Sequence, residues 1–173
     1  MAITTAAGIA FNTVTNETTA GADNASQLAP LGFQLVVPTV NDGDQVWTYV
    51  KANGALGAGE ICQYINGAQQ AEVQPTATGT LVQKAGIVGV AQHAIGDNGF
   101  GFILTKGRGT VRAGSGAIGA DRALTSGGAG GGNLGRGLDF AAGNVAPGCI
   151  IGWVSVGAGA TNQAQVWIDC GGT

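Results

Sequence analysis

Short runs of apolar and β-branched residues, each closed by glycine, recur along this chain of 173 residues. The clearest runs are 87–91, 99–104 and 107–112 in the middle of the chain, and 148–156 and 163–169 near its end. Runs of 4–8 such residues bounded by Gly, Asn and Asp are typical of short antiparallel strands. The hydrophobic pattern therefore predicts an all-β protein.

The first strong strand signals follow Phe33. The run 33–37 ends at Pro38, and Asn, Asp and Gly at 41–44 predict a turn. In the next run, 45–51, alternate side chains belong to opposite faces of a strand. Val46, Thr48 and Val50 then share one face, and Trp47, Tyr49 and Lys51 share the other. The run 61–65 predicts a further strand after a Gly/Asn-rich connection.

A hairpin is predicted in the middle of the chain. The apolar runs 86–95 and 99–106 are joined by Gly-Asp-Asn-Gly at 96–99, and Gly and Asn tolerate the positive φ of tight turns. Residues 121–125 form a candidate short strand, whereas the best helix candidate, 20–28, is short and lacks a sustained period. The expected fold is a compact antiparallel β-barrel or β-sandwich of short strands with little helix.

The composition divides the chain into an arm and one domain. Residues 1–32 carry only isolated hydrophobic residues and predict an extended N-terminal arm, either frayed or docked on a neighbour. Residues 33–173 predict a single β-rich domain. Within it, 127–137 holds seven glycines in eleven residues, so we expect a flexible loop there.

The charge of the chain excludes several function classes. Charged residues make up 10% of the chain, against about 25% in typical domains, and the formal net charge is −3. Nucleic-acid binding needs clustered Lys and Arg, so we expect no nucleic-acid partner. Four arginines do gather between 108 and 136, as a solvated strand face or a local basic patch: Arg108, Arg112, Arg122 and Arg136.

No run approaches the length of a membrane span, and the first residues lack the basic and apolar regions of a secretory signal. We therefore expect a protein made in a cytoplasm, without a membrane partner. The chain's low charge and mean hydropathy of +0.23 suit a protein that covers much of its surface with copies of itself or with a partner.

One motif invites a cofactor hypothesis. Residues 114–119 match G-x-G-x-x-G after a predicted strand. Dinucleotide binding also needs a helix that opens at the third glycine and holds the pyrophosphate. Here Ala-Asp-Arg and then the glycine-rich loop follow, so we expect no cofactor site.

The sequence offers few candidate residues for catalysis or metal binding. The single histidine, His93, excludes a multi-histidine metal site and is the only candidate general base of its type. Cys62, Cys149 or Ser155 could serve as its nucleophile, but no motif supplies an orienting group or an oxyanion hole. The close acidic pair Asp42 and Asp44 lies in a predicted turn with too few oxygen ligands for calcium. We expect no catalytic, cofactor-binding or metal site.

The remaining cysteines and the tryptophans are interpreted as packing residues. Cys62, Cys149 and Cys170 are odd in number and lack CxxC spacing, so we expect small buried side chains and no disulfide framework. The three tryptophans lie within strand-like runs, which favours core packing over a sugar-stacking platform: Trp47, Trp153 and Trp167.

Four phrases along the chain carry a family likeness. They are WTYVKANGALGAGE at 47–60, GIVGVA at 86–91, GFGFILTKGRGTV at 99–111 and PGCIIGW at 147–153, followed by a closing strand. In this order of glycines and β-branched residues, the stretch 45–170 resembles the small capsid decoration (cement) proteins of tailed bacteriophages.

The resemblance implies a β-rich structural protein on the outside of an icosahedral capsid. Such proteins bind the major capsid protein, often as homotrimers, and stabilise the shell by bridging its subunits. Two other hypotheses stay open. A fibre, tail or receptor-binding module for host glycans predicts exposed aromatic clusters in loops, whereas the tryptophans here lie in strand-like runs. A small β-barrel enzyme predicts convergent polar residues, with His93 as its main candidate.

Overall fold

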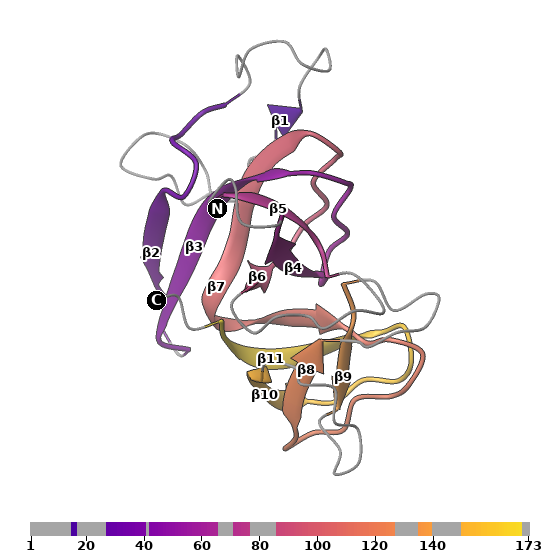
Figure 1. Cartoon of the computed structure of the whole chain (residues 1–173). Coiled ribbons are helices and arrows are strands. Elements are labelled where there is room, and N and C mark those ends of the chain that lie inside the picture. Colours follow the sequence, from indigo (N-terminus) through magenta and orange to yellow (C-terminus); the bar gives the residue numbers. More distant parts are fainter. Residues whose placement is uncertain are drawn as a thin grey trace.

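The protein is described from a computed structural model, which places residues 15–16, 27–40, 42–65, 71–76, 86–126, 135–139 and 150–170 (Figure 1). Within these ranges the chain forms strands, turns and bridges and no α-helix, which confirms the all-β expectation. None of these residues belongs to a helix that is long and apolar enough to cross a membrane. The strands are β1 (Thr15–Asn16), β2 (Gln34–Pro38), β3 (Asp44–Ala52), β4 (Ile61–Tyr64), β5 (Glu72–Pro75), β6 (Ile87–Val90), β7 (Gly99–Arg112), β8 (Ala123–Ser126), β9 (Gly137–Asp139), β10 (Ile150–Val156) and β11 (Gln163–Asp169).

Five strands close into a first barrel in the order β3, β5, β4, β6, β7, and back to β3. β3 and β7 pair antiparallel, from Trp47 opposite Leu104 to Lys51 opposite Phe100. β3 and β5 pair parallel, with Ala52 opposite Val73, which departs from the purely antiparallel expectation. The reason is geometric: strand directions cannot alternate all the way around a ring with an odd number of strands.

A second barrel follows from the same long strand. Residues 106–112 of β7 pair with β11, and β10, β8 and β9 continue the sheet. The ring closes through a parallel bridge between Ala113 and Gly137, beside which the Gly114 N–H donates to the Gly137 carbonyl at 3.1 Å. Figure 1 shows β7 leaving the upper group of strands and continuing beside β11 in the lower group. One strand is thus the last of the first barrel and the first of the second.

The two barrels are copies of each other in their pairing. Cys62 lies opposite Gly89 in the first barrel, as Leu124 lies opposite Gly152 in the second. The closing contacts correspond in the same way, since the parallel pair Ala52 and Val73 has its counterpart in Ala113 and Gly137. The isolated bridge between Leu56 and Ile95 has its counterpart between Ile118 and Ala158. The chain is therefore a tandem duplication of one five-stranded unit.

The duplication also places the backbone positions with positive φ. Each of the four bridge residues is followed, three positions later, by a residue in the left-handed region: Gly59 (φ 81), Asn98 (φ 57), Asp121 (φ 58) and Thr161 (φ 64). The predicted turn at 96–99 is one of these, and the Gly99 N–H donates to the Gly96 carbonyl at 2.9 Å. β6 and β7 are antiparallel neighbours as predicted, although β6 ends at Val90 and β7 extends to Arg112.

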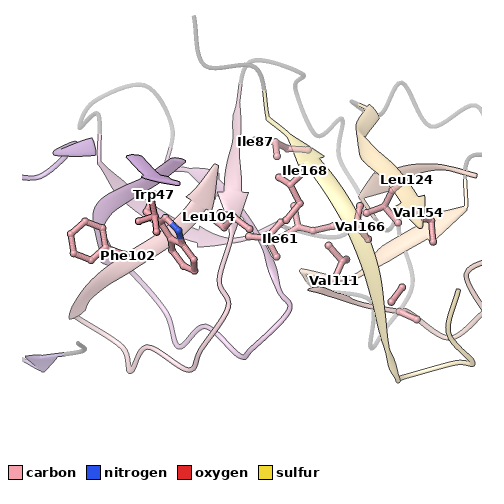
Figure 2. Close-up of a cluster of buried hydrophobic side chains, with 14 of the residues drawn as sticks. Trp47, Ile61, Ile87, Phe102, Leu104, Val111, Leu124, Val154, Val166 and Ile168 are labelled. Carbon is pink, nitrogen blue, oxygen red and sulfur yellow. The ribbon is translucent and has the colours of Figure 1, made fainter. Parts of the chain in front are cut away.

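The interiors of the two barrels are filled from equivalent positions. The first interior holds the buried residues Val50, Ala52, Leu56, Cys62, Val73, Ala91, Ile95 and Ile103. Their counterparts in the second interior include Val111, Ala113, Ile118, Leu124, Val154 and Val166, all in the main hydrophobic cluster. Figure 2 shows that this cluster continues from Val111 and Leu124 past Ile168 to Leu104 and Trp47 of the first barrel. The two barrels therefore share a continuous apolar interface.

β2 pairs antiparallel with the edge of β3, from Gln34 opposite Thr48 to Pro38 opposite Asp44, and the segment before β2 packs on the outward face of the barrel. The Gly32 N–H donates to the Tyr49 carbonyl at 2.8 Å, and the ring of Phe33 meets that of Phe102 edge to face. Burial on both sides explains why Trp47 and Val50, on opposite faces of β3, are both buried. Of the predicted arm 1–32, only 15–16 and 27–32 are described, and β1 pairs with β7 at Phe100.

One further sequence-based prediction is confirmed, and two others fall partly outside the described residues. The candidate strand 121–125 is observed as β8. In the glycine-rich loop 127–137, only 135–137 are described, and they pack tightly: the Ile61 N–H donates to the Gly135 carbonyl at 2.7 Å. The weak helix candidate 20–28 lies outside the described residues except for Gln27 and Leu28, which are not helical.

Candidate docking face on the second barrel

The residues considered for catalysis are not assembled into one site. The Cys62 thiol lies in the first barrel interior and donates to the Glu60 carbonyl at 3.5 Å. The Ser155 hydroxyl donates to the backbone carbonyl of Gln165 at 3.1 Å. The buried Nε2 atom of His93 has no hydrogen-bond partner among the described residues. No two of these three side chains are hydrogen-bonded to each other.

The titration properties of the first barrel agree with packing roles. Burial raises the pKa of the Cys62 thiol far above its ordinary value, because desolvation penalises the thiolate. Burial also lowers the pKa of His93, since the imidazolium is the charged form. Cys170 is half buried and packs against the main cluster, as expected for a small apolar residue. Cys149 lies outside the described residues.

The G-x-G-x-x-G motif at 114–119 is part of the duplicated turn. Ile118 pairs with Ala158 in an isolated bridge, and a turn and then β8 follow Gly119. No helix N-terminus stands at this place, so the group that would hold a pyrophosphate in a dinucleotide site is missing here.

The acidic pair and the arginines take part in several different contacts. Asp42 lies in the β2–β3 turn, where its Oδ1 accepts a hydrogen bond from Arg108 Nη1 at 2.7 Å. Arg112 Nε donates to the Thr161 carbonyl, and Arg136 lies 3.9 Å from the Glu60 carboxylate. Among the described residues, no group of three or more His, Cys, Asp or Glu side chains could hold a metal ion. Burial, and then the positive charge of Arg112, lower the pKa of Arg136, so these two arginines lie near each other, while Arg108 bonds to Asp42.

The prediction that the tryptophans are core residues is correct for one of them and wrong for two. Trp47 is buried, and its Nε1–H donates to Gln45 Oε1 at 3.2 Å. Trp153 is 51% exposed and Trp167 is 42% exposed. Both occupy outward positions of the second barrel, as the strict alternation of exposed and buried residues along β11 shows for Trp167.

Trp153 and Trp167 form one exposed patch. They lie directly opposite each other on β10 and β11, and on the next strand Arg108 lies opposite Trp167. Residues directly opposite across antiparallel strands have Cβ atoms about 5 Å apart, so the two indole side chains are neighbours. Val156, 50% exposed, lies opposite Gln165, two residues along β11 from Trp167 and past a register shift between Val154 and Val156. We call Trp153, Val156, Gln165 and Trp167 the tryptophan face.

A shallow depression of about 330 Å³ borders this face where the two barrels meet. It is lined by Asp42, Gly43 and Asp44 of the β2–β3 turn, Lys106 and Gly107 of β7, and Trp167, Ile168 and Asp169 of β11. Three carboxylates thus lie beside an exposed apolar surface without a histidine, and the Ser155 hydroxyl beside it donates to the Gln165 carbonyl. The arrangement is suited to binding a surface, and among the described residues it is the largest grouping of exposed aromatic side chains.

Comparisons with known proteins give a likeness in fold. No family model matches the chain, and no curated protein matches it. Among solved structures, the chain is similar to the head fiber gp8.5 N base in bacteriophage phi29, with a TM-score of 0.51 and 16% sequence identity. The similarity covers 73% of this chain and 95% of that chain. At this identity the comparison establishes a shared β fold.

Proposed function

We propose that this protein is a non-enzymatic structural component of a bacteriophage particle and that it binds the major capsid protein on the outside of the head. The fold carries the proposal, because nearly the whole of a solved phage head fiber base, 95% of that chain, is similar to it. The four phrases at 47–60, 86–91, 99–111 and 147–153, which resemble capsid decoration proteins, support the same class independently of the fold.

The architecture suits attachment to a shell. Two closed barrels joined by a shared strand and an apolar interface form a rigid body, and rigid partners lose little conformational freedom on binding. A protein that binds only the assembled shell stabilises it by mass action, and many copies on one particle add avidity. The dispersed positions of Cys62, His93 and Ser155 support a role without catalysis.

In its finer form, the proposal is a decoration protein that bridges neighbouring capsid subunits as a homotrimer. Co-sedimentation tests it: purified protein is titrated onto empty mature shells of its phage, and the bound copies are counted per coat subunit. We expect saturation near one copy per coat subunit and a higher temperature of shell disruption when the sites are full. Absence of pelleting with shells of verified mature form would contradict the proposal.

The base of a head fibre is a second candidate function, favoured by the identity of the structural neighbour. A fibre base would also bind the head, and it would hold a further projecting component. The same titration separates the two functions. Saturation with no change in the disruption temperature supports the fibre base over the decoration protein.

A further inference from the structure

We infer that the tryptophan face is an interface between copies of this chain, with a second copy covering Trp153 and Trp167. This inference rests on the homotrimer part of the proposed function and names the surface through which copies meet. It follows from comparing one pair of positions in the two barrels.

The pair Trp153 and Trp167 has a counterpart in the first barrel, at the same positions of the strand pairing. Val90 lies opposite Leu104 there, as Trp153 lies opposite Trp167 in the second barrel. The neighbouring glycines confirm the match, because a Cβ on Gly89 would strike the Leu104 carbonyl and a Cβ on Gly152 would strike the Trp167 carbonyl. The same outward position of the same unit is therefore occupied by an aliphatic pair in one barrel and by an indole pair in the other.

The aliphatic pair is covered by the other barrel. Val90 and Leu104 are both 0% exposed and belong to the cluster that also contains Ile168 of β11. Leu104 approaches the backbone of Gly109 so closely that a Cβ there would overlap its side chain. Gln92 reinforces the contact, because its Oε1 accepts from the Thr110 N–H at 2.9 Å and its Nε2 donates to the Thr110 carbonyl at 3.0 Å.

Among the described residues, the equivalent face of the second barrel has no such cover. The side chains of Trp153 and Trp167 are 51% and 42% exposed. The residue that corresponds to Gln92 is Ser155, whose hydroxyl turns back to the Gln165 carbonyl of its own barrel. Trp167 also lines the depression formed with Asp42 and Asp44 of the first barrel, so the tryptophan face adjoins the line where the two barrels meet.

The side chains on this face indicate a contact and not a solvated end. In repeat proteins, the outer face of a terminal unit is polar when it only caps the stack. Here the terminal unit carries larger apolar side chains than its covered counterpart, and tryptophan is among the residues most enriched at the centres of interfaces. Within the chain, a barrel of the same kind covers the equivalent face, and a second copy supplies another such barrel.

The test is the mass of the protein in solution without capsids. Light scattering during size-exclusion chromatography should give a multiple of the 16.9 kDa chain mass for the wild type. The double variant Trp153→Thr/Trp167→Thr keeps strand-forming residues at exposed positions, and its mass should fall to that of the monomer. Val36→Thr is the matched control, since Val36 is a 57% exposed strand residue outside this face and its loss should leave the mass unchanged. Circular dichroism and a cooperative thermal transition verify that each variant is folded.

A gentler variant tests the face without adding polarity. Trp153→Val/Trp167→Leu transfers the first barrel's pair to the second, and should weaken association at least about tenfold because a central indole contact is lost. In the wild type, acrylamide should quench Trp153 and Trp167 less at high protein concentration than at high dilution, since association covers them.

The outcomes separate this inference from the proposed function. A wild-type chain that stays monomeric at every concentration, or an oligomer unaffected by the threonine variant, overturns the inference. A monomer whose threonine variant loses binding to shells assigns the face to the capsid protein; the inference and the homotrimer then fail, while the proposed capsid binding stands. An oligomer that the threonine variant dissociates, in a protein that never pellets with shells, upholds the inference and contradicts the proposed function.

Discussion

The two barrels of this protein have the same strand order and pairing register, yet they differ where one meets its surroundings. Val90 and Leu104 of the first barrel are buried against the second barrel, while Trp153 and Trp167, at the equivalent positions, are exposed. Pairing register is set by the backbone, so a duplicated unit keeps it. The outward side chains are free to change with what covers them, which makes them the informative difference between the copies.

The interiors differ in a compensating way. Cys62 and Val73 of the first barrel correspond to Leu124 and Gly137 of the second. A Cβ on Gly137 would lie 2.9 Å from Leu124 Cδ1, so the larger leucine fills the space that a side chain at 137 would need. The two interiors are thus filled by different pairs of side chains with a similar total volume, as close-packed interiors allow.

The largest effect on stability is expected at the glycine where two strands lie closest together, a feature that both barrels share. Gly152→Ala places a Cβ on the Trp167 carbonyl and should cost about 3 kcal/mol of unfolding free energy. Gly89→Ala, with its Cβ 2.7 Å from the Leu104 carbonyl oxygen, should cost about 2 kcal/mol. Denaturant unfolding measures both. Gly116→Ala is the control, since nothing lies within 4 Å of its Cβ, and it should change stability by less than about 0.5 kcal/mol. Equal effects at all three positions would refute the close-approach argument.

Exchanging interior residues between the barrels should give a smaller, non-additive effect. Leu124→Cys alone leaves a cavity and should cost about 2 to 3 kcal/mol. Gly137→Val alone overpacks the site against Val111 and Leu124 and should cost about 2 kcal/mol. The double variant recreates the first barrel's pair, and its cost should fall short of the sum by at least about 1 kcal/mol. Strict additivity in the unfolding cycle would show that the two positions do not share volume.

A pH effect should distinguish the barrels through His93. Its pKa is lowered in the folded protein by burial, while the unfolded chain titrates near 6.5. Below that pH the unfolded state takes up a proton that the native state resists, so the free energy of unfolding should fall as pH decreases. His93→Val, which copies Val156 of the second barrel, should remove this part of the pH dependence. Unfolding of both proteins between pH 7.5 and about 5 measures the difference, and parallel curves would contradict it.

The smallest effect is expected at the ion pair that links the β2–β3 turn to the shared strand. Asp42 Oδ1 and Arg108 Nη1 are 2.7 Å apart, but the two side chains are 33% and 37% exposed. Exposed pairs contribute at most about 1 kcal/mol, and salt screens them. Asp42→Asn should therefore lower stability by less than about 1 kcal/mol, with the difference shrinking as salt is added. A larger, salt-insensitive loss would show that this contact holds the barrels together.

Much of the strand content was predictable because alternation and glycine punctuation are local properties. The predicted runs 33–37, 45–51 and 61–65 correspond to β2, β3 and β4. β5 and β9 were not predicted, because Glu72–Pro75 lies in a polar stretch and Gly137–Asp139 follows a run of glycines. These short strands are defined by their partners and not by their own residues.

The duplication left a trace in the sequence that the strand analysis did not use. Ala-Leu-Gly-Ala at 55–58 returns as Ala-Ile-Gly-Ala at 117–120, and Ile-Val-Gly at 87–89 returns as Ile-Ile-Gly at 150–152. Aligning the chain with itself would have predicted two equivalent units. It would not have revealed the tryptophan face, because the prediction of buried tryptophans used residue type alone.

By itself, the sequence determined the class of structure: low charge, β-branched runs and glycine-closed turns leave the chain little alternative to short paired strands. Only the tertiary structure decided that the strands close into two barrels, that Trp47 is buried, and that Trp153 and Trp167 are exposed. The physical reason is that strand propensity acts between chain neighbours, whereas exposure depends on which distant surface covers a strand. In this chain, the second barrel covers the first, and no described residue covers the tryptophan face to the same extent.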